Sequence, residues 1–570
     1  MRYTDLSFKK IIFMVAIVAA LGAGVFAASS VWEERVGTFS LTAVNYVFTD
    51  ALTAMVYRTE FQEQSLLAAI GVVTAPRTAA AAPTGGVARS IPVLLYHGIV
   101  PNATHVEDVT PAQFKAQMFA LKIDGWQTVS IYDFVNAMQG KVTLPPKSFL
   151  LTFDDGRKAS YYPVDPVLQA LGYRATMFVI TGHSLAPGNE NNPYYLSQSE
   201  LETMLKSGRW DLQSHGYVGH ADYPIDASGN TASFYGNKLW VPSQVSGEAT
   251  SEYASRLAGD FMNYFTKHEA WPASPGHLET TAEYQNRIYN DLVTAKQDLE
   301  NKLGPTVVSF AYPFSDYAAN TKTDFSGSKT TLVNTVDQIY PVSFYQWFPG
   351  GGFSQNYPGV DGQLLKRMEP SNSWSGDYLA SLLDEGQAKM LPFMSSSTST
   401  AGWQATWGNA SEKAGSLALR APSSTTGAFA FLDGSGAWKG YTYTAQFDWG
   451  GNNESVTLVG DFQENVNDTK YLQCVFEKGN VRIEGDVNNT AIPIATEKDA
   501  MIGPGSNKNA SIRFTSGGYV QCLWNGGVVA SARMPASLPA SGGIGAEIWS
   551  AAAGTASVTF TNVSVTGATR

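Results

Sequence analysis

Two adjacent carboxylates follow an apolar segment in the first half of the chain. Asp154 and Asp155 come directly after Ser148–Phe153, and Gly156 follows them. Neighbouring side chains on an extended chain point to opposite sides, so one carboxylate can face a metal while the other faces a substrate. Asp-Asp-Gly is also common in helix caps and turns after strands. The pair by itself therefore leaves both interpretations open.

Two of the seven histidines, His215 and His220, stand five residues apart after the strand-like segment Trp210–Ser214. A regular helix would place them about 140° apart, so they must converge through a loop. Gly216 and Gly219 make such a loop possible. Two imidazoles and one carboxylate, with water in the open position, are typical of a catalytic divalent metal site. The alternative is a pair of surface-loop histidines, which the nearby carboxylate pair disfavours.

Two further strand-like segments end at groups of the kinds that take part in catalysis. His97 follows the apolar segment Ile91–Tyr96, where an imidazole can protonate a leaving amine. The segment Ser309–Tyr312 ends at a proline, and the next backbone N–H, that of Phe314, can serve as an oxyanion donor. The alternative for His97 is an ordinary histidine of the core or of a turn. The alternative for the second segment is that the chain simply leaves a strand at the proline.

These motifs together resemble the polysaccharide deacetylase superfamily, carbohydrate esterase family four. The resemblance is carried by Thr152–Gly156, the spaced histidines and the Ala-Tyr-Pro-Phe segment at 311–314. The Leu-Leu-Tyr-His-Gly run at 94–98, the histidine spacing and Phe-Ala-Tyr-Pro at 310–313 are most similar to the biofilm poly-N-acetylglucosamine deacetylase branch. The resemblance covers roughly residues 90 to 393.

The resemblance implies a role for each matching position. Asp154 would be the catalytic base, and the metal would be held by Asp155, His215 and His220. The Phe314 N–H would help to stabilise the oxyanion. Many relatives place the general-acid histidine near the end of the domain, but no histidine follows His277 here. The biofilm branch resembles a circularly permuted version with this histidine at the start, which makes His97 the candidate.

Two departures from the family pattern concern the neighbourhood of the catalytic base. Ser315 stands where the family usually has glycine, and the usual arginine before this segment is absent. Arg367, in Lys-Arg-Met-Glu-Pro, is the candidate for orienting Asp154 in its place.

The activity implied by the resemblance is metal-dependent N-deacetylation of an amino-sugar polysaccharide. Zn²⁺ is the expected metal, although nickel, cobalt and iron suit the same ligands. Poly-N-acetylglucosamine is the leading substrate, ahead of peptidoglycan, chitin-like oligomers and other acetylated exopolysaccharides. One alternative is an inactive glycan-binding surface protein, which would not need the metal ligands. Another is a glycosidase, but two adjacent carboxylates cannot flank a glycosidic bond.

The elements that must position these residues alternate between strands and helices from residue 91 to 394. This alternation predicts an α/β fold, a parallel sheet or barrel with its site at the carboxyl ends of the strands, and the resemblance implies a distorted (β/α) barrel. Two helices are clearly marked, one by Thr110 and Pro111 and one from the capping box at Thr280 to Gly304. Residues 221–277 interrupt the alternation and are expected to form a loop-rich insertion. The strands are expected at 92–96, 148–153, 175–181, 210–214, 307–311 and 342–345.

The last part of the chain, residues 400–570, has a different pattern of apolar and polar residues. Segments that alternate apolar and polar residues are separated by turns rich in Gly and Asn, which predicts an all-β sandwich of jelly-roll type. The sandwich holds six of the 13 tryptophans, which suits a carbohydrate-binding module or a core filled by aromatic rings. Its Cys474 and Cys522 form either one disulfide or two buried thiols. The six tryptophans are Trp403, Trp407, Trp438, Trp449, Trp524 and Trp549.

The N-terminus and the overall charge indicate where the protein works. Basic residues precede an apolar run, Ile11–Ala28, which fits a membrane anchor or a cleaved signal peptide. Residues 31–90 are expected to form a helical stalk and linker. Both interpretations of residues 1–30 place the catalytic part outside the cytoplasm. The net charge of −11, without a long basic run, argues against a nucleic-acid partner.

Overall fold

The computed structural model describes residues 41–69, 87–272, 275–319, 324–347, 355–359, 362–396, 401–450, 453–463, 469–488 and 490–567. The chain divides into two compact units, Met1–Gln62 and Glu63–Arg570. Helix α2 (Leu41–Ala69) is the first described element. Within the described ranges, no helix has both the length and the apolar character needed to cross a bilayer. The expected membrane segment, Ile11–Ala28, lies outside these ranges.

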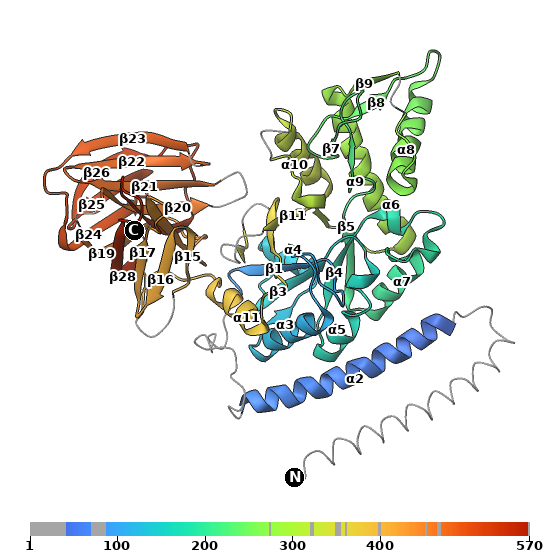
Figure 1. Ribbon diagram of the computed structural model, residues 1–570, viewed down its shortest axis with the longest axis horizontal. Helices are drawn as coiled ribbons and strands as arrows, with labels where there is room; N and C mark the ends of the chain where they lie inside the picture. The colour runs from blue at the N-terminus through green and yellow to red at the C-terminus, as the bar shows by residue number, and fades with distance from the viewer. Residues whose placement is uncertain are drawn as a thin grey trace, which may run out of the picture. The chain divides into compact units, whose positions relative to one another are not determined.

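Seven parallel strands form a closed barrel surrounded by helices (Figure 1). The hydrogen-bonded order is β1-β13-β11-β10-β5-β4-β3, and β3 pairs back to β1, with Leu94 opposite Leu151. The expected distorted (β/α) barrel is confirmed. The strands are β1 (Ile91–Tyr96), β3 (Ser148–Phe153), β4 (Ala175–Val179), β5 (Trp210–Ser214), β10 (Ser309–Ala311), β11 (Val342–Trp347) and β13 (Leu365–Met368).

The barrel strands are buried along their length because helices cover the outside and side chains fill the inside. Every residue of β1, β3, β4, β5 and β13 is buried. Strands that are covered on both faces are rich in apolar residues, and this pattern predicted most of them from the sequence. Short edge strands β2 (Gln127–Thr128) and β12 (Gln355–Asn356) pair with β3 and β1.

The helices around the barrel begin and end at capping residues that the sequence marks. Thr110 accepts a hydrogen bond from the Gln113 N–H at the start of α3, and Gly304 ends α9 in the left-handed conformation. Helices lie between the barrel strands and after the last of them. They are α3 (Pro111–Ile123), α4 (Ile131–Met138), α5 (Asp165–Leu171), α6 (Thr181–Ser184), α7 (Gln198–Ser207), α9 (Thr281–Leu303), α10 (Ser328–Ile339) and α11 (Gly376–Glu385).

Residues 221–277 form a small layer between β5 and α9. The sequence predicted mainly loops, but the structure also contains an 18-residue helix, α8 (Thr250–Lys267). Aromatic rings from the hairpin and the helix pack together, including Tyr223 and Phe261 with ring centroids 5.2 Å apart. The strands of this layer are β6 (Asp222–Pro224), β7 (Thr231–Ser233), β8 (Trp240–Pro242) and β9 (Gly276–Leu278).

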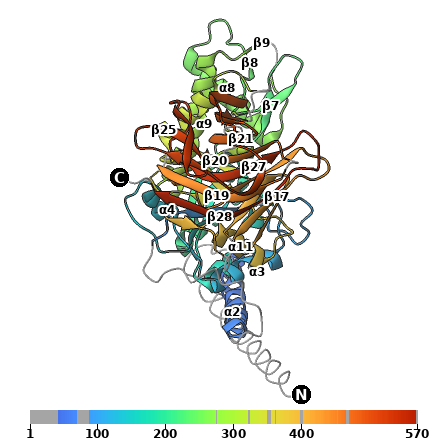
Figure 2. The ribbon, with the colours of Figure 1, turned by 90° about the vertical axis from the view of Figure 1, so that its left-hand side faces the viewer.

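The C-terminal part consists of two antiparallel sheets, as the sequence predicted (Figure 2). The eight-stranded sheet contains β16 (Asn409–Lys413), β17 (Ser416–Arg420), β28 (Ser557–Gly567), β19 (Tyr441–Trp449), β24 (Gly505–Phe514), β25 (Tyr519–Trp524), β26 (Gly527–Arg533) and, paired to β28, β14 (Phe393–Met394). The seven-stranded sheet runs β15 (Trp403–Trp407), β18 (Gly427–Leu432), β27 (Gly543–Trp549), β20 (Ser455–Gln463), β21 (Lys470–Glu477), β22 (Asn480–Val487) and β23 (Thr490–Lys498).

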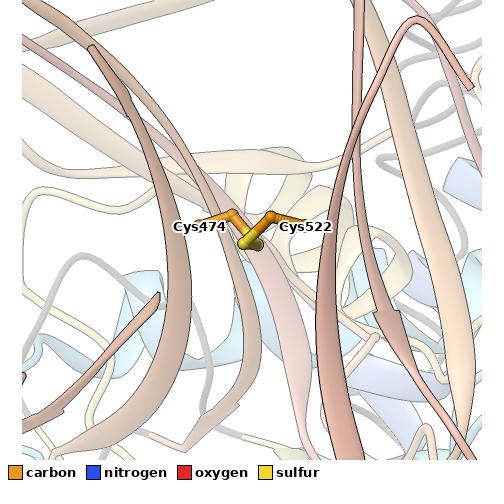
Figure 3. Close-up of a disulfide and its surroundings, with 2 residues drawn as sticks. All are labelled: Cys474 and Cys522. Atoms are coloured by element: carbon orange, nitrogen blue, oxygen red, sulfur yellow. A yellow bond between two sulfur atoms is a disulfide. The ribbon is translucent and has the colours of Figure 1, made fainter. Parts of the chain in front are cut away.

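The core between these sheets contains a disulfide, which decides between the two states that the sequence left open. Cys474 on β21 and Cys522 on β25 are joined across the core, one from each sheet (Figure 3). Four of the six tryptophans are also buried, whereas Trp407 and Trp549 are 36% and 39% exposed. Most of the indole rings therefore fill the core, and two remain at the surface.

Candidate active site

The carboxylate pair lies at the carboxyl end of β3, at the barrel edge where the sequence placed it. Asp154 is fully buried, and Asp155 and Gly156 both have positive φ, 72° and 70°. A non-glycine residue in this left-handed conformation is uncommon and is typical of a constrained turn. The turn sends the two carboxylates toward different partners, as described below.

The two histidines converge on Asp155. The Nε2 atoms of His215 and His220 lie 3.5 and 3.2 Å from Asp155 Oδ1. The Nδ1–H of His215 donates to the Ala311 carbonyl at 2.8 Å, which leaves the Nε2 lone pair for a cation. The loop that the sequence required between the histidines therefore exists and brings both imidazoles to one point.

This set of ligand atoms fits a divalent metal ion. The three ligand atoms of Asp155, His215 and His220 all lie within 4.8 Å of one another, the one such group among the described residues. Asp155 Oδ1 is buried and has no hydrogen-bond partner, which is costly unless a cation satisfies it. Burial raises the pKa of Asp155, but the adjacent histidines outweigh this and hold it well below the ordinary value.

The histidine loop is held from outside the barrel by residues that the sequence did not single out. The Asp291 carboxylate, on α9, accepts from the backbone N–H groups of Tyr217 and Val218 at 3.1 and 2.8 Å. The Tyr235 hydroxyl donates to the same carboxylate at 2.6 Å. A Cβ on Gly219 would approach the Tyr235 ring to 2.5 Å, so only glycine fits beneath it.

Arg367 holds Asp154 in a bidentate ion pair, where the sequence offered it as a candidate. Its two terminal nitrogens lie 2.6 and 2.7 Å from the two carboxylate oxygens, and both side chains are fully buried. Burial alone would raise the pKa of Asp154, but the charge of Arg367, together with His215, lowers it. Asp154 is therefore fixed in one orientation and ionised at neutral pH.

His97 faces Asp154 from the end of β1. Its Nε2 lies 3.9 Å from Asp154 Oδ2 and 3.1 Å from the Gln346 amide nitrogen. Its Nδ1 lies 2.5 Å from Glu369 Oε1. Burial lowers the pKa of His97, but the hydrogen bond and charge of Glu369 outweigh it and raise the pKa to about 9. His97 is thus protonated at neutral pH and oriented through its other nitrogen.

Phe314 is the one candidate that acts through its backbone. It is the second residue of the short helix η3 (Pro313–Ser315), where backbone N–H groups have no partner within the helix. Its φ of 55° is left-handed, and its ring lies 4.2 Å from that of His220 and is 55% exposed. The segment therefore lies beside His220.

Glu369 and Gln346 are the site residues that sequence reasoning missed. Arg367 lies on β13 and Glu369 directly follows the strand, two positions further on, where the alternation of an extended chain favours the same side. This alternation was a usable signal once Arg367 had been chosen. Gln346 is paired with Arg367 across β11 and β13, a register that the sequence does not reveal.

Comparison with known proteins agrees with this geometry. A family model described as polysaccharide deacetylase matches residues 141–329, which include the carboxylate pair and both metal-type histidines. Residues 141–329 are thus similar to the polysaccharide deacetylase family. The match begins after His97 and ends before Arg367, so it does not cover these two residues.

The similar curated proteins are poly-β-1,6-N-acetyl-D-glucosamine N-deacetylases by name. The chain is 25% identical over 217 residues to the poly-β-1,6-N-acetyl-D-glucosamine N-deacetylase of Escherichia coli K12, covering 36% of this chain and 28% of that protein. It is 33% identical over 113 residues to the enzyme of the same name from Staphylococcus epidermidis, covering 20% of this chain and 38% of that protein. The chain thus matches less than two fifths of the length of either relative.

Solved structures also resemble part of the chain. A de-N-acetylase from Aggregatibacter actinomycetemcomitans aligns with 51% of this chain and 99% of its own length, at 17% identity and a TM-score of 0.39.

Proposed function

We propose that this protein removes acetyl groups from an N-acetylated amino-sugar polysaccharide of the poly-N-acetylglucosamine type, in a metal-dependent reaction outside the cytoplasmic membrane. The observation that carries the proposal is the meeting of three metal-type ligands with an oriented carboxylate, Asp154, and a protonated imidazole, His97, at one barrel edge. The names of the related proteins support the substrate class.

The proposed reaction is hydrolysis of an acetamide. A divalent ion held by Asp155, His215 and His220, with Zn²⁺ the expected ion, would polarise the acetamide carbonyl and lower the pKa of water. Asp154, fixed by Arg367, accepts a proton from the attacking water. The Phe314 N–H donates to the oxygen that becomes negative. His97 gives its Nε2 proton to the sugar nitrogen as the C–N bond breaks, releasing acetate and an amine.

Aromatic side chains beside the site support a sugar substrate. The segment 194–196 pairs with the residues that follow the carboxylate pair, through Leu196 N–H to the Gly156 carbonyl at 2.8 Å. It carries Tyr194, which is 45% exposed, and Tyr195, which stacks on His183 at 4.1 Å. Aromatic faces beside a polar centre suit the apolar faces of sugar rings.

The proposed location is outside the cytoplasm. The Cys474–Cys522 disulfide supports it, because disulfides persist mainly in oxidising compartments. The apolar run at Ile11–Ala28 also supports export from the cytoplasm.

The substitution Asp154→Asn tests the assignment of the base. The variant should keep its metal, because Asp154 is not one of the three ligands, yet lose about 10²-fold or more of its turnover. Acetate release from β-1,6-linked N-acetylglucosamine oligomers, with and without chelator, and metal content by mass spectrometry measure the two properties. Asp377→Asn, an exposed carboxylate on α11, is the control. Full activity in Asp154→Asn would refute the mechanism.

A further inference from the structure

Two oppositely charged side chains, Asp108 and Arg157, face each other beside the histidine proposed as the acid. Gly98 directly follows His97, and a Cβ on this glycine would lie 2.0 Å from Asp108 Oδ1 and 3.2 Å from Arg157 Nη2. The absence of a side chain on Gly98 is what lets the carboxylate approach the backbone so closely. The glycine of the Leu-Leu-Tyr-His-Gly run thus makes room for a charged pair immediately next to His97.

Hydrogen bonds to the backbone hold both side chains at this position. The loop that carries Asp108 returns to the barrel, because the residue after it donates its backbone N–H to the Gly98 carbonyl at 2.9 Å. Arg157 begins the turn that follows the carboxylate pair, and the Ser160 hydroxyl of that turn donates to the His97 carbonyl. Both charged residues are therefore anchored to the two residues that end the first barrel strand.

Neither charge is neutralised by a protein partner. Among the described residues, the Asp108 carboxylate and the Arg157 guanidinium form no ion pair and no side-chain hydrogen bond, with each other or with any other group. Asp108 is only 8% exposed, and the Nε–H of Arg157 is buried. Water can meet these groups in the free protein. A ligand that replaces this water must offer a donor to the carboxylate and an acceptor to the guanidinium.

Tyr194 supplies an aromatic surface at the same place. The Arg157 guanidinium lies over its ring, 4.8 Å from the centroid, and the tyrosine is 45% exposed. The backbone of the tyrosine is fixed as well, since the Lys158 N–H donates to the Tyr194 carbonyl at 2.8 Å. The contact with the ring limits the motion of the guanidinium, and the exposed part of the ring can take the apolar face of a sugar.

The chemistry of the charged pair matches two neighbouring hydroxyl groups. A carboxylate only accepts hydrogen bonds and a guanidinium only donates them, whereas a hydroxyl group does both. Two hydroxyls on adjacent carbons of one sugar can therefore bridge Asp108 and Arg157, one donating to the carboxylate and the other accepting from the guanidinium. A charged substituent would attract one member of the pair and repel the other. The pair thus favours neutral hydroxyls over acidic or cationic groups.

The position of His97 indicates which hydroxyls these are. On the proposed mechanism its Nε2 meets the nitrogen at carbon 2 of the sugar, so groups beside His97 face the next carbons of the same ring. We propose that Asp108 and Arg157 bind the 3- and 4-hydroxyls of the sugar that loses its acetyl group, with Tyr194 against the sugar, and that this pair selects the linkage of the polymer. The inference rests on the proposed function, because the acid orients the sugar.

Linkage is selected because the two hydroxyls are not free in every polymer. A 1,6-linked polymer leaves the 3- and 4-hydroxyls of each sugar unsubstituted. In a 1,4-linked polymer the 4-oxygen carries the next sugar, which would meet the guanidinium of Arg157 and can no longer offer a hydroxyl there. The pair therefore accepts internal sugars of a 1,6-linked chain and rejects those of a 1,4-linked chain.

Acetate release from two pentamers of N-acetylglucosamine that differ only in linkage tests the inference. The full-length wild-type protein should show a kcat/KM at least about tenfold higher for the β-1,6-linked pentamer than for the β-1,4-linked one. In the β-1,4-linked pentamer only the non-reducing terminal sugar has both hydroxyls free, so tandem mass spectrometry should find the residual deacetylation there. Equal kcat/KM values for the two pentamers overturn the inference.

Substitution of the pair tests the two residues directly. Asp108→Ala and Arg157→Gln should each raise KM for the β-1,6-linked pentamer by about tenfold or more, with a smaller fall in kcat, because they remove contacts to the sugar and not to the reacting atoms. The β-1,4-linked pentamer should be affected less, so the preference between linkages should shrink. Asp377→Asn and Arg420→Gln, at exposed positions on α11 and β17, are the matched controls. Unchanged KM in both folded variants contradicts the assignment.

Binding separates this inference from the proposed function. Calorimetry in the Asp154→Asn background measures affinity without turnover, and loss of Asp108 or Arg157 should weaken binding of the β-1,6-linked pentamer by about tenfold. If wild type releases no acetate from either pentamer, the proposed function fails, and this affinity difference alone decides the inference. Equal affinity with and without the pair would then overturn it. The comparison of linkages in wild type needs no substitution, so it stands even if a variant does not fold.

Discussion

At the scale of single residues, the site uses histidine for two tasks by changing only the acceptor at Nδ1. His215 directs its Nδ1 to a backbone carbonyl, which turns its Nε2 toward the metal-type ligands. His97 faces the Glu369 carboxylate instead, which favours the protonated ring. One histidine is thereby prepared to bind a cation and the other to give up a proton.

The partnership of His97 and Glu369 makes a prediction about pH. Because His97 must be protonated to act as the acid, turnover should persist below its pKa and fall as pH rises through about 9. Glu369→Gln removes the charge that raises this pKa, so the alkaline limb of the kcat profile should move toward neutral pH. Glu107→Gln, an exposed carboxylate in the same region, is the control. An unchanged alkaline limb in Glu369→Gln would rule out this role.

The residues of the site were predictable where they follow strands in recognisable motifs. Asp154, Asp155, His215 and His220 lie together because β3 and β5 are parallel and end at one edge, and a loop returns His220 to that edge. Asp291 on α9 and Tyr235 after β7 were not predictable, since neither belongs to a motif with catalytic or metal-binding spacing. Their contribution depends on three-dimensional packing that spacing alone cannot show.

At the scale of elements, the insertion supports the histidine loop through tyrosine side chains, of which Tyr235 is one. Tyr235 follows β7 and reaches Asp291, and together they fix the loop that joins the two metal-type histidines. Tyr235 is thus a positioning residue, which touches neither substrate nor metal ligand atoms.

The loss of the Tyr235 hydroxyl should show in metal affinity. Tyr235→Phe leaves the ring in place against Gly219 but removes one of the two donors to Asp291 Oδ2, so the loop should loosen and metal affinity should fall by about 10–100-fold. Competition with a fluorescent chelator measures this directly. Tyr132→Phe removes a tyrosine hydroxyl whose acceptor, the Thr306 carbonyl, lies in a loop before β10, and it should bind metal as wild type does. Equal affinity in both variants would contradict the role.

Among the barrel strands, β13 was the one that the sequence did not predict. Its residues include Lys366 and Arg367, and polar residues interrupt the apolar run by which the other strands were found. Arg367 is buried because Asp154 neutralises it, so the strand is stabilised by a partner more than 200 positions away. The bounds of β3 and β5, by contrast, agree with those expected from the sequence, although Asp211 and Gln213 interrupt the apolar residues of β5.

At the scale of the whole molecule, the barrel and the sandwich are stabilised by different means. The sandwich has a covalent link between its sheets, and the described part of the barrel has none. The linking segment is part of the sandwich, since β14 pairs with β28. The expected boundary at residue 400 would therefore remove a strand from a C-terminal fragment.

Removal of the disulfide should affect one domain only. Cys474→Ala combined with Cys522→Ala should destabilise the sandwich by about 2–5 kcal/mol, because the bond closes a loop of 48 residues in the unfolded chain. Differential scanning calorimetry should show the sandwich transition at a lower temperature and acetate release at ordinary temperature unchanged. A loss of acetate release without any shift in the sandwich transition would contradict the expectation that the disulfide stabilises the sandwich alone.

The closure of the barrel between its first and last strands has a consequence for biogenesis. β1 pairs with both β3 and β13, and these strands deliver His97, Asp154 and Arg367. A chain that emerges from a ribosome or translocon presents the histidine and the aspartate long before the arginine. On the proposed mechanism such a nascent chain has an unfinished sheet edge and an unanchored base, so hydrolysis begins only after synthesis has passed residue 369.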